Sequence, residues 1–261
     1  MAEAQSKQVF AEHIGEDGVT KRVADRVAVE EPLEIRIGDV RISTTMRTPG
    51  HDFELAAGFC HAEGLLRGGS VASIRYCADA PATETEFNIV TVETAGDAPE
   101  PTPRLGTTTS SCGICGAESI QQLLEHLRPL DNPRKFPSDV LATIPDKVRP
   151  LQTLFEKTGG VHAAAACDLN GDPLIVREDI GRHNAVDKVV GRMLLDGNLP
   201  ASDLCLFVSG RASFEILQKA WAAGFPTIAA VSAPSALAVA LAQTANIHLT
   251  AFLRPPAMKF Y

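Results

Sequence analysis

Hydrophobic residues follow a regular succession of patterns over the second half of the chain. Short apolar runs, such as the one at 204–208, have the length and composition of strands that are buried on both faces. Between these runs, apolar positions three and four residues apart indicate helices that bury one side. The predicted strands span 163–167, 173–176, 204–208, 227–231 and 247–252, and the predicted helices span 184–195, 214–222 and 237–245. This alternation predicts an α/β fold whose sheet lies between two helical layers.

The first half of the chain has a different pattern. Leu33, Ile35 and Ile37 alternate with polar residues, and Gly38-Asp39 is typical of a hairpin turn before the next alternating run. A helix is expected from about 51 to 64, followed by strands within 71–93. We therefore predict a β-rich N-terminal lobe at 25–106 and an α/β domain at 107–261. Residues 1–24 are polar without a clear period, which predicts a loose leader.

Composition narrows the function classes. The chain has 261 residues, of which 45% are hydrophobic and 21% charged, as is ordinary for a globular protein. A formal net charge of −8 argues against a general polyanion binder, so no nucleic-acid partner is expected. No apolar run approaches the roughly 18 residues of a membrane span, and the N-terminus lacks the apolar core of a signal peptide. We expect a cytoplasmic protein that does not contact membranes.

Two of the six cysteines, Cys112 and Cys115, form a C-x-x-C pair. They follow a run of five hydroxyl residues, alternate with Gly113 and Gly116, and precede a helical stripe that begins at Ile120. A loop that leads into a helix N-terminus favours a reactive thiolate, because the helix dipole lowers the pKa of the thiol. The pattern predicts that Cys112 carries sulfur as a persulfide and that Cys115 assists or resolves it.

Other interpretations of the pair are less well supported. A zinc site needs four ligands, and no second pair or suitably spaced histidine is present, so no metal is expected. A thioredoxin-like dithiol would follow the first strand of its fold, whereas this pair lies well into the chain. Chance co-occurrence does not account for the flanking glycines and the hydroxyl run.

Candidate anion-binding residues lie in loops that follow the predicted strands. Ser209-Gly210-Arg211 combines a close-approach glycine with a forked donor before a helix, and Ser232–Ser235 and Phe252-Leu253-Arg254 occupy corresponding positions. Arg182 and His183 lie in a polar turn at 177–184 that also fits an ordinary helix cap. Together these loops predict a phosphate-binding cradle without a Walker or dinucleotide motif.

His162 invites comparison with zinc deaminases. Those enzymes place a glutamate two positions after the histidine and their cysteine pair after that. Here Ala164 occupies the glutamate position, and the cysteine pair precedes His162. The sequence therefore predicts no deaminase chemistry, and His162 is expected to be a core or loop residue.

Several motifs together resemble one known family. They are Glu31-Pro32-Leu33, 46–50 (MRTPG), Gly58-Phe59 with Glu63-Gly64, 111–116 (SCGICG), 177–188 (REDIGRHNAVDK), 209–215 (SGRASFE) and 231–234 (VSAP). In this order they are similar to the formate dehydrogenase accessory sulfurtransferases of the FdhD family. The resemblance covers residues 27–261, and the motif at 177–188 is the most specific.

The resemblance implies a function and a fold. Members take sulfur from a cysteine desulfurase on the first cysteine of the pair, here Cys112. They transfer it to the bis-molybdopterin guanine dinucleotide cofactor, which is a bound substrate, before the cofactor enters the formate dehydrogenase apoenzyme. This transfer is required for formate dehydrogenase activity. The family also implies a homodimer and a cytidine-deaminase-like three-layer sheet.

The family's cofactor-binding segment corresponds to Phe252, Leu253, Arg254, Pro255, Pro256 and Ala257. The family usually has a glycine or polar residue and a second basic residue where Pro255, Pro256 and Ala257 stand here. Two other functions are compatible with parts of the sequence: a cofactor-binding chaperone whose cysteines do no chemistry, and a zinc-dependent nucleotide hydrolase.

Overall fold

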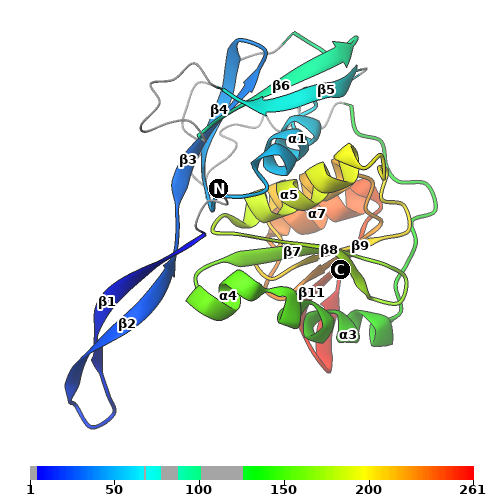
Figure 1. Cartoon of the computed structure of the whole chain (residues 1–261). Coiled ribbons are helices and arrows are strands. Elements are labelled where there is room, and N and C mark those ends of the chain that lie inside the picture. Colours follow the sequence, from blue (N-terminus) through cyan, green and yellow to red (C-terminus); the bar gives the residue numbers. More distant parts are fainter. Residues whose placement is uncertain (1–4, 68, 78–87, 101–125) are drawn as a thin grey trace.

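The computed structural model describes residues 5–67, 69–77, 88–100 and 126–261. They form a two-stranded hairpin, a four-stranded sheet and a six-stranded sheet, in that order along the chain (Figure 1). The four-stranded sheet with helix α1 makes an N-terminal lobe, and the six-stranded sheet is the centre of an α/β domain. The mixed α/β class and the β-rich N-terminal region predicted from the sequence are confirmed.

The N-terminal lobe is built on strands β3 (Glu31–Ile37), β4 (Val40–Arg47), β5 (Gly69–Tyr76) and β6 (Ile89–Gly96), in the order β4-β3-β6-β5. Strands β3 and β4 form the predicted hairpin around Gly38, whose φ of 54° suits glycine. Leu33, Ile35 and Ile37 point to one face and pack with helix α1 (Asp52–Ala62).

The larger sheet has the order β12-β11-β10-β9-β7-β8. Its strands are β7 (His162–Cys167), β8 (Pro173–Asp179), β9 (Cys205–Val208), β10 (Thr227–Ala230), β11 (His248–Arg254) and β12 (Ala257–Phe260). Strands β9, β10 and β11 are parallel, whereas β7 runs antiparallel to both β8 and β9. The start of β7 therefore lies beside the end of β9, and this places His162 at the edge where the parallel strands finish.

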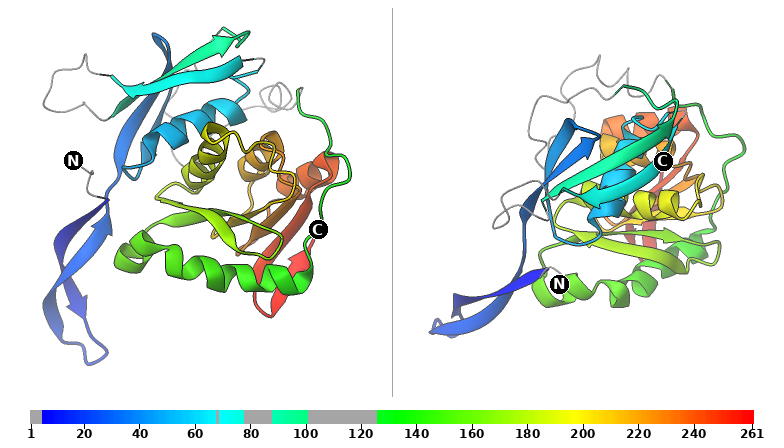
Figure 2. Two further views of the ribbon diagram at one scale, coloured as in Figure 1. Left: turned by 45° about the vertical axis from the view of Figure 1, so that its right-hand side comes forward. Right: turned by 45° about the horizontal axis from the view of Figure 1, so that its top comes forward.

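Helices cover both faces of this sheet (Figures 1 and 2). Helices α5 (Arg182–Leu195), α6 (Phe214–Ala222) and α7 (Ala236–Ala245) share one apolar core with the sheet. Helix α3 (Ser138–Val148) contributes to the core on the other face, where η1 (Arg149–Leu151) and α4 (Thr153–Thr158) follow it. No helix among the described residues is long and apolar enough to cross a membrane.

The two lobes meet where α1 lies against α5 (Figure 1). A Cβ added at Gly58 would lie 1.9 Å from the carbonyl oxygen of Asp187, and one at Gly191 would lie 1.8 Å from the carbonyl oxygen of Glu54. Each glycine therefore lets the backbone of one helix touch the other, and no larger residue fits at either position.

The N-terminal segment differs from the sequence expectation. Residues 1–24 are predicted to be a loose leader, but β1 (Ser6–Ile14) and β2 (Thr20–Ala28) pair as an antiparallel hairpin. This hairpin projects away from both lobes in every view (Figures 1 and 2). Because it has no buried face, charged and apolar residues occur on both sides, and the usual alternation of a half-buried strand is lost.

Candidate functional site

The loops after β9 and β10 and the end of β11 are joined side by side at one edge of the large sheet. Ser232 donates its backbone N–H to the carbonyl of Gly210 (3.3 Å), and Phe252 donates to the carbonyl of Ser232 (3.1 Å). Ala212 donates to the carbonyl of Ala233 (3.2 Å). The structure therefore brings together the three strand-end loops that the sequence predicted as a cradle.

His162 reaches the same edge from the start of β7. Ser209 donates its N–H to the carbonyl of Ala163, and the Ser209 hydroxyl accepts from the Ala163 N–H, both at 2.9 Å. A Cβ at Gly210 would lie 3.3 Å from His162 Nδ1 and 3.8 Å from Arg182 Cδ. Gly210 therefore permits a close approach between the β9 loop, the β7 histidine and the start of α5.

The charges at this edge are mainly positive. Burial lowers the pKa of Arg182, and the nearby Arg211 lowers it further. Arg182 Nε is buried and has no hydrogen-bond partner among the described residues, and Arg211 is exposed and forms no ion pair with any of them. An anion placed here would relieve this repulsion and accept hydrogen bonds from both guanidinium groups.

Two histidines lie beside these arginines, and Arg182, Arg211, His162 and His183 together form a cation cluster. Burial lowers the pKa of His162, and so do the charges of Arg182, His183 and Arg211. Burial also lowers the pKa of His183, although a hydrogen bond with Glu215 opposes this; His183 Nε2 lies 3.2 Å from Ser213 Oγ and 3.6 Å from Glu215 Oε2. The hydrogen bond with His183 lowers the pKa of Glu215 to about 2. Glu215 thus orients His183 while the remaining groups favour an anion.

A cavity of about 560 Å³ opens beside this cluster, with His162 and Ser209 in its wall. The opposite wall comes from the end of α3 and from α4, where the Arg149 guanidinium lies 4.5 Å from the ring centre of Phe155. A volume of this size accommodates a small organic ligand. An anionic group at the cluster and a planar group in the cavity can belong to one ligand.

The predicted segment 252–257 divides into parts with different surroundings. Phe252 has a left-handed backbone (φ 52°) and is half-buried beside the β10 loop, whereas the Leu253 side chain is 1% exposed in the core. Arg254, Pro255, Pro256 and Ala257 are exposed around the turn between β11 and β12. Leu253 can offer a ligand only its backbone, because its side chain is a core residue.

Lys259 was not identified from the sequence as a candidate site residue. Its Nζ lies 4.6 Å from the ring centre of Phe252, so β12 places a cation beside this segment. This chain has no basic residue between Pro255 and Ala257, and Lys259 supplies a positive charge nearby from the neighbouring strand. No local pattern pointed to Lys259, because β12 is too short and too exposed to show a strand pattern.

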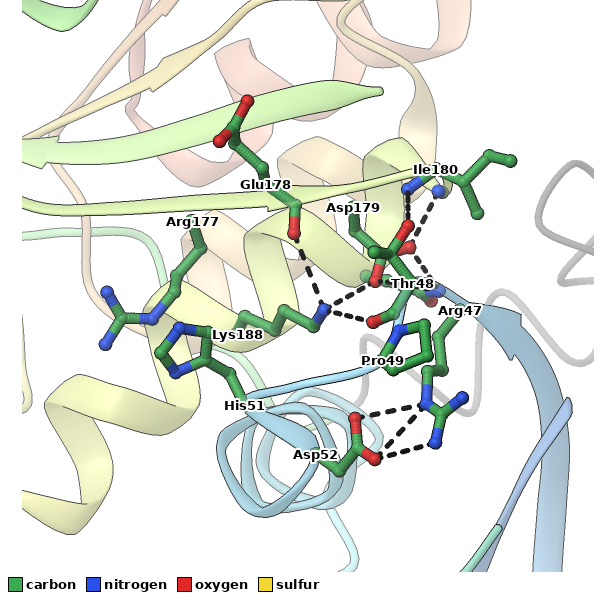
Figure 3. Close-up of polar contacts among 12 residues, drawn as sticks. Arg47, Thr48, Pro49, His51, Asp52, Arg177, Glu178, Asp179, Ile180 and Lys188 are labelled. Carbon is green, nitrogen blue, oxygen red and sulfur yellow. Dashed lines mark hydrogen bonds and ion pairs between the residues drawn. The ribbon is translucent and has the colours of Figure 1, made fainter. Parts of the chain in front are cut away.

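The motif at 177–188 serves two purposes. Figure 3 shows that Asp179 and Lys188, which pair at 2.7 Å, both bind the segment that follows β4. Asp179 accepts a hydrogen bond from the Thr48 N–H (3.1 Å), and Lys188 donates to the Thr48 carbonyl (2.9 Å). The Thr48 hydroxyl in turn accepts from the Ile180 N–H (3.1 Å). These groups hold the lobes together, so only Arg182 and His183 of this motif remain with the cation cluster.

Further buried charge pairs lie within each lobe, and one of them joins the two lobes. Arg47 binds Asp52 through both carboxylate oxygens, at 2.9 to 3.2 Å, and both side chains are fully buried (Figure 3). Lys219 on α6 pairs with Asp187 on α5 at 2.8 Å. Arg177 donates to both oxygens of Glu54 on α1. Much of the motif sequence is therefore explained by contacts within the α/β domain and between the lobes rather than by ligand binding.

The predicted nucleophile Cys112 and its neighbour Cys115 lie outside the described residues. Of the described cysteines, Cys60, Cys167 and Cys205 are buried; burial raises the pKa of Cys60 and of Cys167 to about 12, and that of Cys205 also lies above its usual range. These three thiols are protonated and inaccessible at neutral pH, so none of them suits nucleophilic chemistry. No group of three or more potential metal ligands occurs in the described parts of the chain.

Comparison with known proteins gives a consistent result. The model of the FdhD/NarQ family matches residues 28–261. The sulfur carrier protein FdhD of Mycobacterium tuberculosis is 46% identical over 259 residues, which cover 95% of this chain and 94% of that protein. The protein of the same name from Corynebacterium efficiens is 45% identical over 246 residues, covering 91% and 89% of the two chains.

A solved structure from Desulfotalea psychrophila, assigned as a formate dehydrogenase accessory protein, has the same fold. It superposes with a TM-score of 0.77 and covers 98% of this chain and 97% of its own, at 24% sequence identity. The similarity therefore includes the N-terminal lobe as well as the α/β domain.

Proposed function

The chain belongs to the FdhD/NarQ family, and we propose that it is a sulfur carrier that matures a formate dehydrogenase. The proposal rests above all on identity near 46%, over more than nine-tenths of the chain, to proteins named sulfur carrier protein FdhD. The acceptor is the bis-molybdopterin guanine dinucleotide cofactor, bound as a substrate. The donor is a cysteine desulfurase, and the protein acts in the cytoplasm as a homodimer.

The proposed chemistry begins at Cys112. Its thiolate attacks the terminal sulfur of the donor's persulfide, so a new S–S bond forms on Cys112 while the donor leaves as a thiolate. Transfer then breaks this S–S bond: the outer sulfur passes to the bound cofactor, whose reduced metal supplies the two electrons that convert it to sulfide, and Cys112 leaves as a thiolate. Cys115 is the neighbouring thiol that can resolve the persulfide as a disulfide. The buried state of Cys60, Cys167 and Cys205 supports the assignment, because it removes half of the six cysteines from consideration.

The cation cluster supplies the proposed cofactor site. Arg182 and Arg211, with His183 held by Glu215, offer donors to phosphate oxygens, and Ser209 and Gly210 allow close approach of the backbone. The adjacent cavity, with its Arg149–Phe155 stack, offers a planar ligand a place to pack. Phe252 and the exposed turn at Arg254–Ala257 extend this surface.

Intact-mass spectrometry tests the carrier role. The protein is incubated with a cysteine desulfurase and cysteine, and the wild type is expected to gain one sulfur atom. Cys112→Ala is expected to gain no sulfur and to leave the client dehydrogenase inactive. Cys77→Ala is the matched control, because Cys77 is a half-buried cysteine of the N-terminal lobe, and this variant should load normally.

The same measurement separates the second candidate function. A chaperone that only binds the cofactor would gain no sulfur in the wild type, yet Cys112→Ala would still activate the dehydrogenase. Active dehydrogenase with the Cys112→Ala variant would therefore rule out the carrier mechanism.

A further inference from the structure

The cavity beside the cation cluster contains a polar side chain that the fold does not use. Gln152 lines this cavity, is only 7% exposed, and makes no side-chain hydrogen bond with any residue that the structure describes. A buried amide normally pairs its NH₂ and carbonyl groups, because leaving them unpaired costs stability. The amide atoms of Gln152 are not sealed inside the core either, so they face the cavity.

A role in helix capping does not explain this glutamine. Gln152 directly precedes α4, but the carboxylate of Glu178 on β8 caps the helix instead, accepting from the N–H groups of Leu154 and Phe155, both at 2.8 Å. The backbone of Gln152 is held in place, since its N–H donates to the carbonyl of Arg149 (3.2 Å). The side-chain amide is therefore positioned at the cavity without a structural partner among the described residues.

The rest of the cavity wall suits a flat ring. Its apolar lining comes from Pro145, Phe155, Val161, Phe207 and Val231. The Arg149 guanidinium lies 4.5 Å from the ring centre of Phe155 and pairs with Glu156 at 3.1 Å, while its side chain stays about half exposed. Because a guanidinium group is planar and stacks on aromatic rings, its open face offers a heterocycle a surface to lie on.

A carboxylate lies at the mouth of the same cavity. Asp146, in the last turn of α3, is exposed and forms no ion pair or hydrogen bond with any residue in the described ranges. The Gln152 amide supplies a donor and an acceptor, and the Asp146 carboxylate supplies further acceptors. From the buried amide to the exposed carboxylate, the wall therefore presents a donor, an acceptor and a second acceptor.

We propose that Gln152 and Asp146 recognise the polar edge of a 2-amino-4-oxopyrimidine ring, which guanine and pterin share. This edge carries a carbonyl, a ring N–H and an amino group in that order. Gln152 donates to the carbonyl and accepts from the ring N–H, and Asp146 accepts from the amino group. The inference rests on the proposed function, whose cofactor contains both rings. Its phosphates reach the cation cluster past His162 and Ser209, which also line the cavity.

Calorimetry with guanosine diphosphate tests the Gln152 contact. Gln152→Ala is expected to lower the affinity roughly tenfold, because two hydrogen bonds to the ring are lost. Gln152→Glu keeps the size of the side chain but removes the donor to the ring carbonyl, so it should weaken binding as well. Gln243→Ala, at an exposed glutamine on α7, is the matched control and should bind like the wild type. Thermal unfolding of each variant verifies that the fold is retained.

A change of base preference tests Asp146. Xanthosine diphosphate has a carbonyl where guanosine diphosphate has the amino group, so the wild type is expected to prefer the guanine nucleotide. Asp146→Asn can donate to that carbonyl and should shift the preference toward xanthosine diphosphate roughly tenfold. Asp139→Asn, in the exposed first turn of the same helix, should leave the preference unchanged. An unchanged preference in Asp146→Asn would overturn the role of this carboxylate.

A free pterin, 6-hydroxymethylpterin, distinguishes the two sources of the ring. If Gln152→Ala loses affinity for guanosine diphosphate, the cavity holds the guanine; if it loses affinity for the pterin, the cavity holds the pterin, and either loss supports the proposal. Wild-type affinity for both ligands in Gln152→Ala would overturn it. Sulfur loading on Cys112 is measured separately by mass. Normal loading with unaltered ligand binding would therefore refute this inference alone, whereas a wild type that gains no sulfur would refute the proposed function.

Discussion

Arg182 and Arg211 illustrate how individual side chains prepare a site for an anion. The charge of Arg211 disfavours the charged form of Arg182, and Glu215, the carboxylate that opposes this effect, is also engaged with His183. A charge-assisted hydrogen bond contributes more than a neutral one when the group is partly desolvated. We therefore expect a bound phosphate to relieve this repulsion.

Replacing Arg211 tests this balance. Arg211→Ala is expected to weaken binding of guanosine diphosphate roughly tenfold or more, measured by calorimetry, because a charged donor to phosphate is lost. Arg134→Ala is the control, since Arg134 is an exposed arginine that pairs with Asp203 elsewhere. Equal affinity in Arg211→Ala and the wild type would contradict the assignment of the cluster.

Glu54 links the acid stability of the protein to the contact between lobes. Burial alone raises its pKa, but hydrogen bonds and charges from Arg177 and His51 outweigh that effect and lower the pKa to about 2. Because the folded-state pKa lies below the usual glutamate value of 4.5, the ionised form stabilises the fold. This contribution is present above pH 4.5 and is lost as the pH falls toward 2.

We expect Glu54→Gln to be less stable than the wild type by up to about 3 kcal/mol at pH 7, with the difference shrinking at pH 3. Urea unfolding at the two pH values gives the comparison. Glu12→Gln, on the exposed hairpin, should change neither value. A difference between Glu54→Gln and the wild type that stayed constant from pH 7 to pH 3 would disprove the linkage.

At the scale of elements, the packing of α1 on α5 depends on two glycines. Gly58→Ala and Gly191→Ala would each place a methyl group less than 2 Å from a carbonyl oxygen of the other helix. Since neither backbone can move aside alone, we expect each variant to lose about 2 kcal/mol or more of stability in thermal or urea unfolding. Gly160→Ala is the control, because its nearest neighbours are 3.7 Å away. If Gly58→Ala were as stable as the wild type, the close contact between the two helices would not be needed for stability.

The sequence predicted elements well where burial is two-sided or strongly periodic. The helix at 214–222 has the observed bounds of α6, and the strands at 204–208 and 227–231 differ from β9 and β10 by one residue. The hairpin β1–β2 and strand β12 were not predicted, because their exposed residues carry no hydrophobic period. The hydrophobic pattern of a sequence reflects which residues are buried, and almost all residues of these elements are exposed or only partly buried.

The candidate site was only partly predictable for a different reason. Ser209, Gly210, Arg211, Arg182 and His183 were identified from their positions at strand ends, and the structure brings them together. The structural role of Asp179 and Lys188 was not apparent, since their partner Thr48 lies more than 130 residues away in the sequence. Nothing in a local pattern indicates such a partner.

At the scale of the whole molecule, Asp179 and Lys188 bind the segment after β4 and so help to join two separate hydrophobic cores. Removing one member of a buried ion pair leaves the other charge uncompensated, which costs about 3–5 kcal/mol. Asp179→Asn should therefore weaken the contact between lobes more than it weakens either core.

The single tryptophan makes this measurable. Trp221 lies on α6, so its fluorescence reports the α/β domain, whereas far-UV circular dichroism reports both lobes. We expect the two signals to coincide during urea unfolding of the wild type and to separate in Asp179→Asn. Asp203→Asn, at an exposed ion pair, should preserve the coincidence. Coincident curves in Asp179→Asn would indicate that the lobes unfold together without this contact.

The glycine contact between α1 and α5 also limits how the protein can move. Sliding of packed helices is usually accommodated by small rotations of interdigitated side chains. At Gly58 and Gly191 the surfaces that meet are main chain, which has no such freedom. Any closure around a bound ligand would therefore come from the strand-end loops, while the two lobes move as one rigid frame.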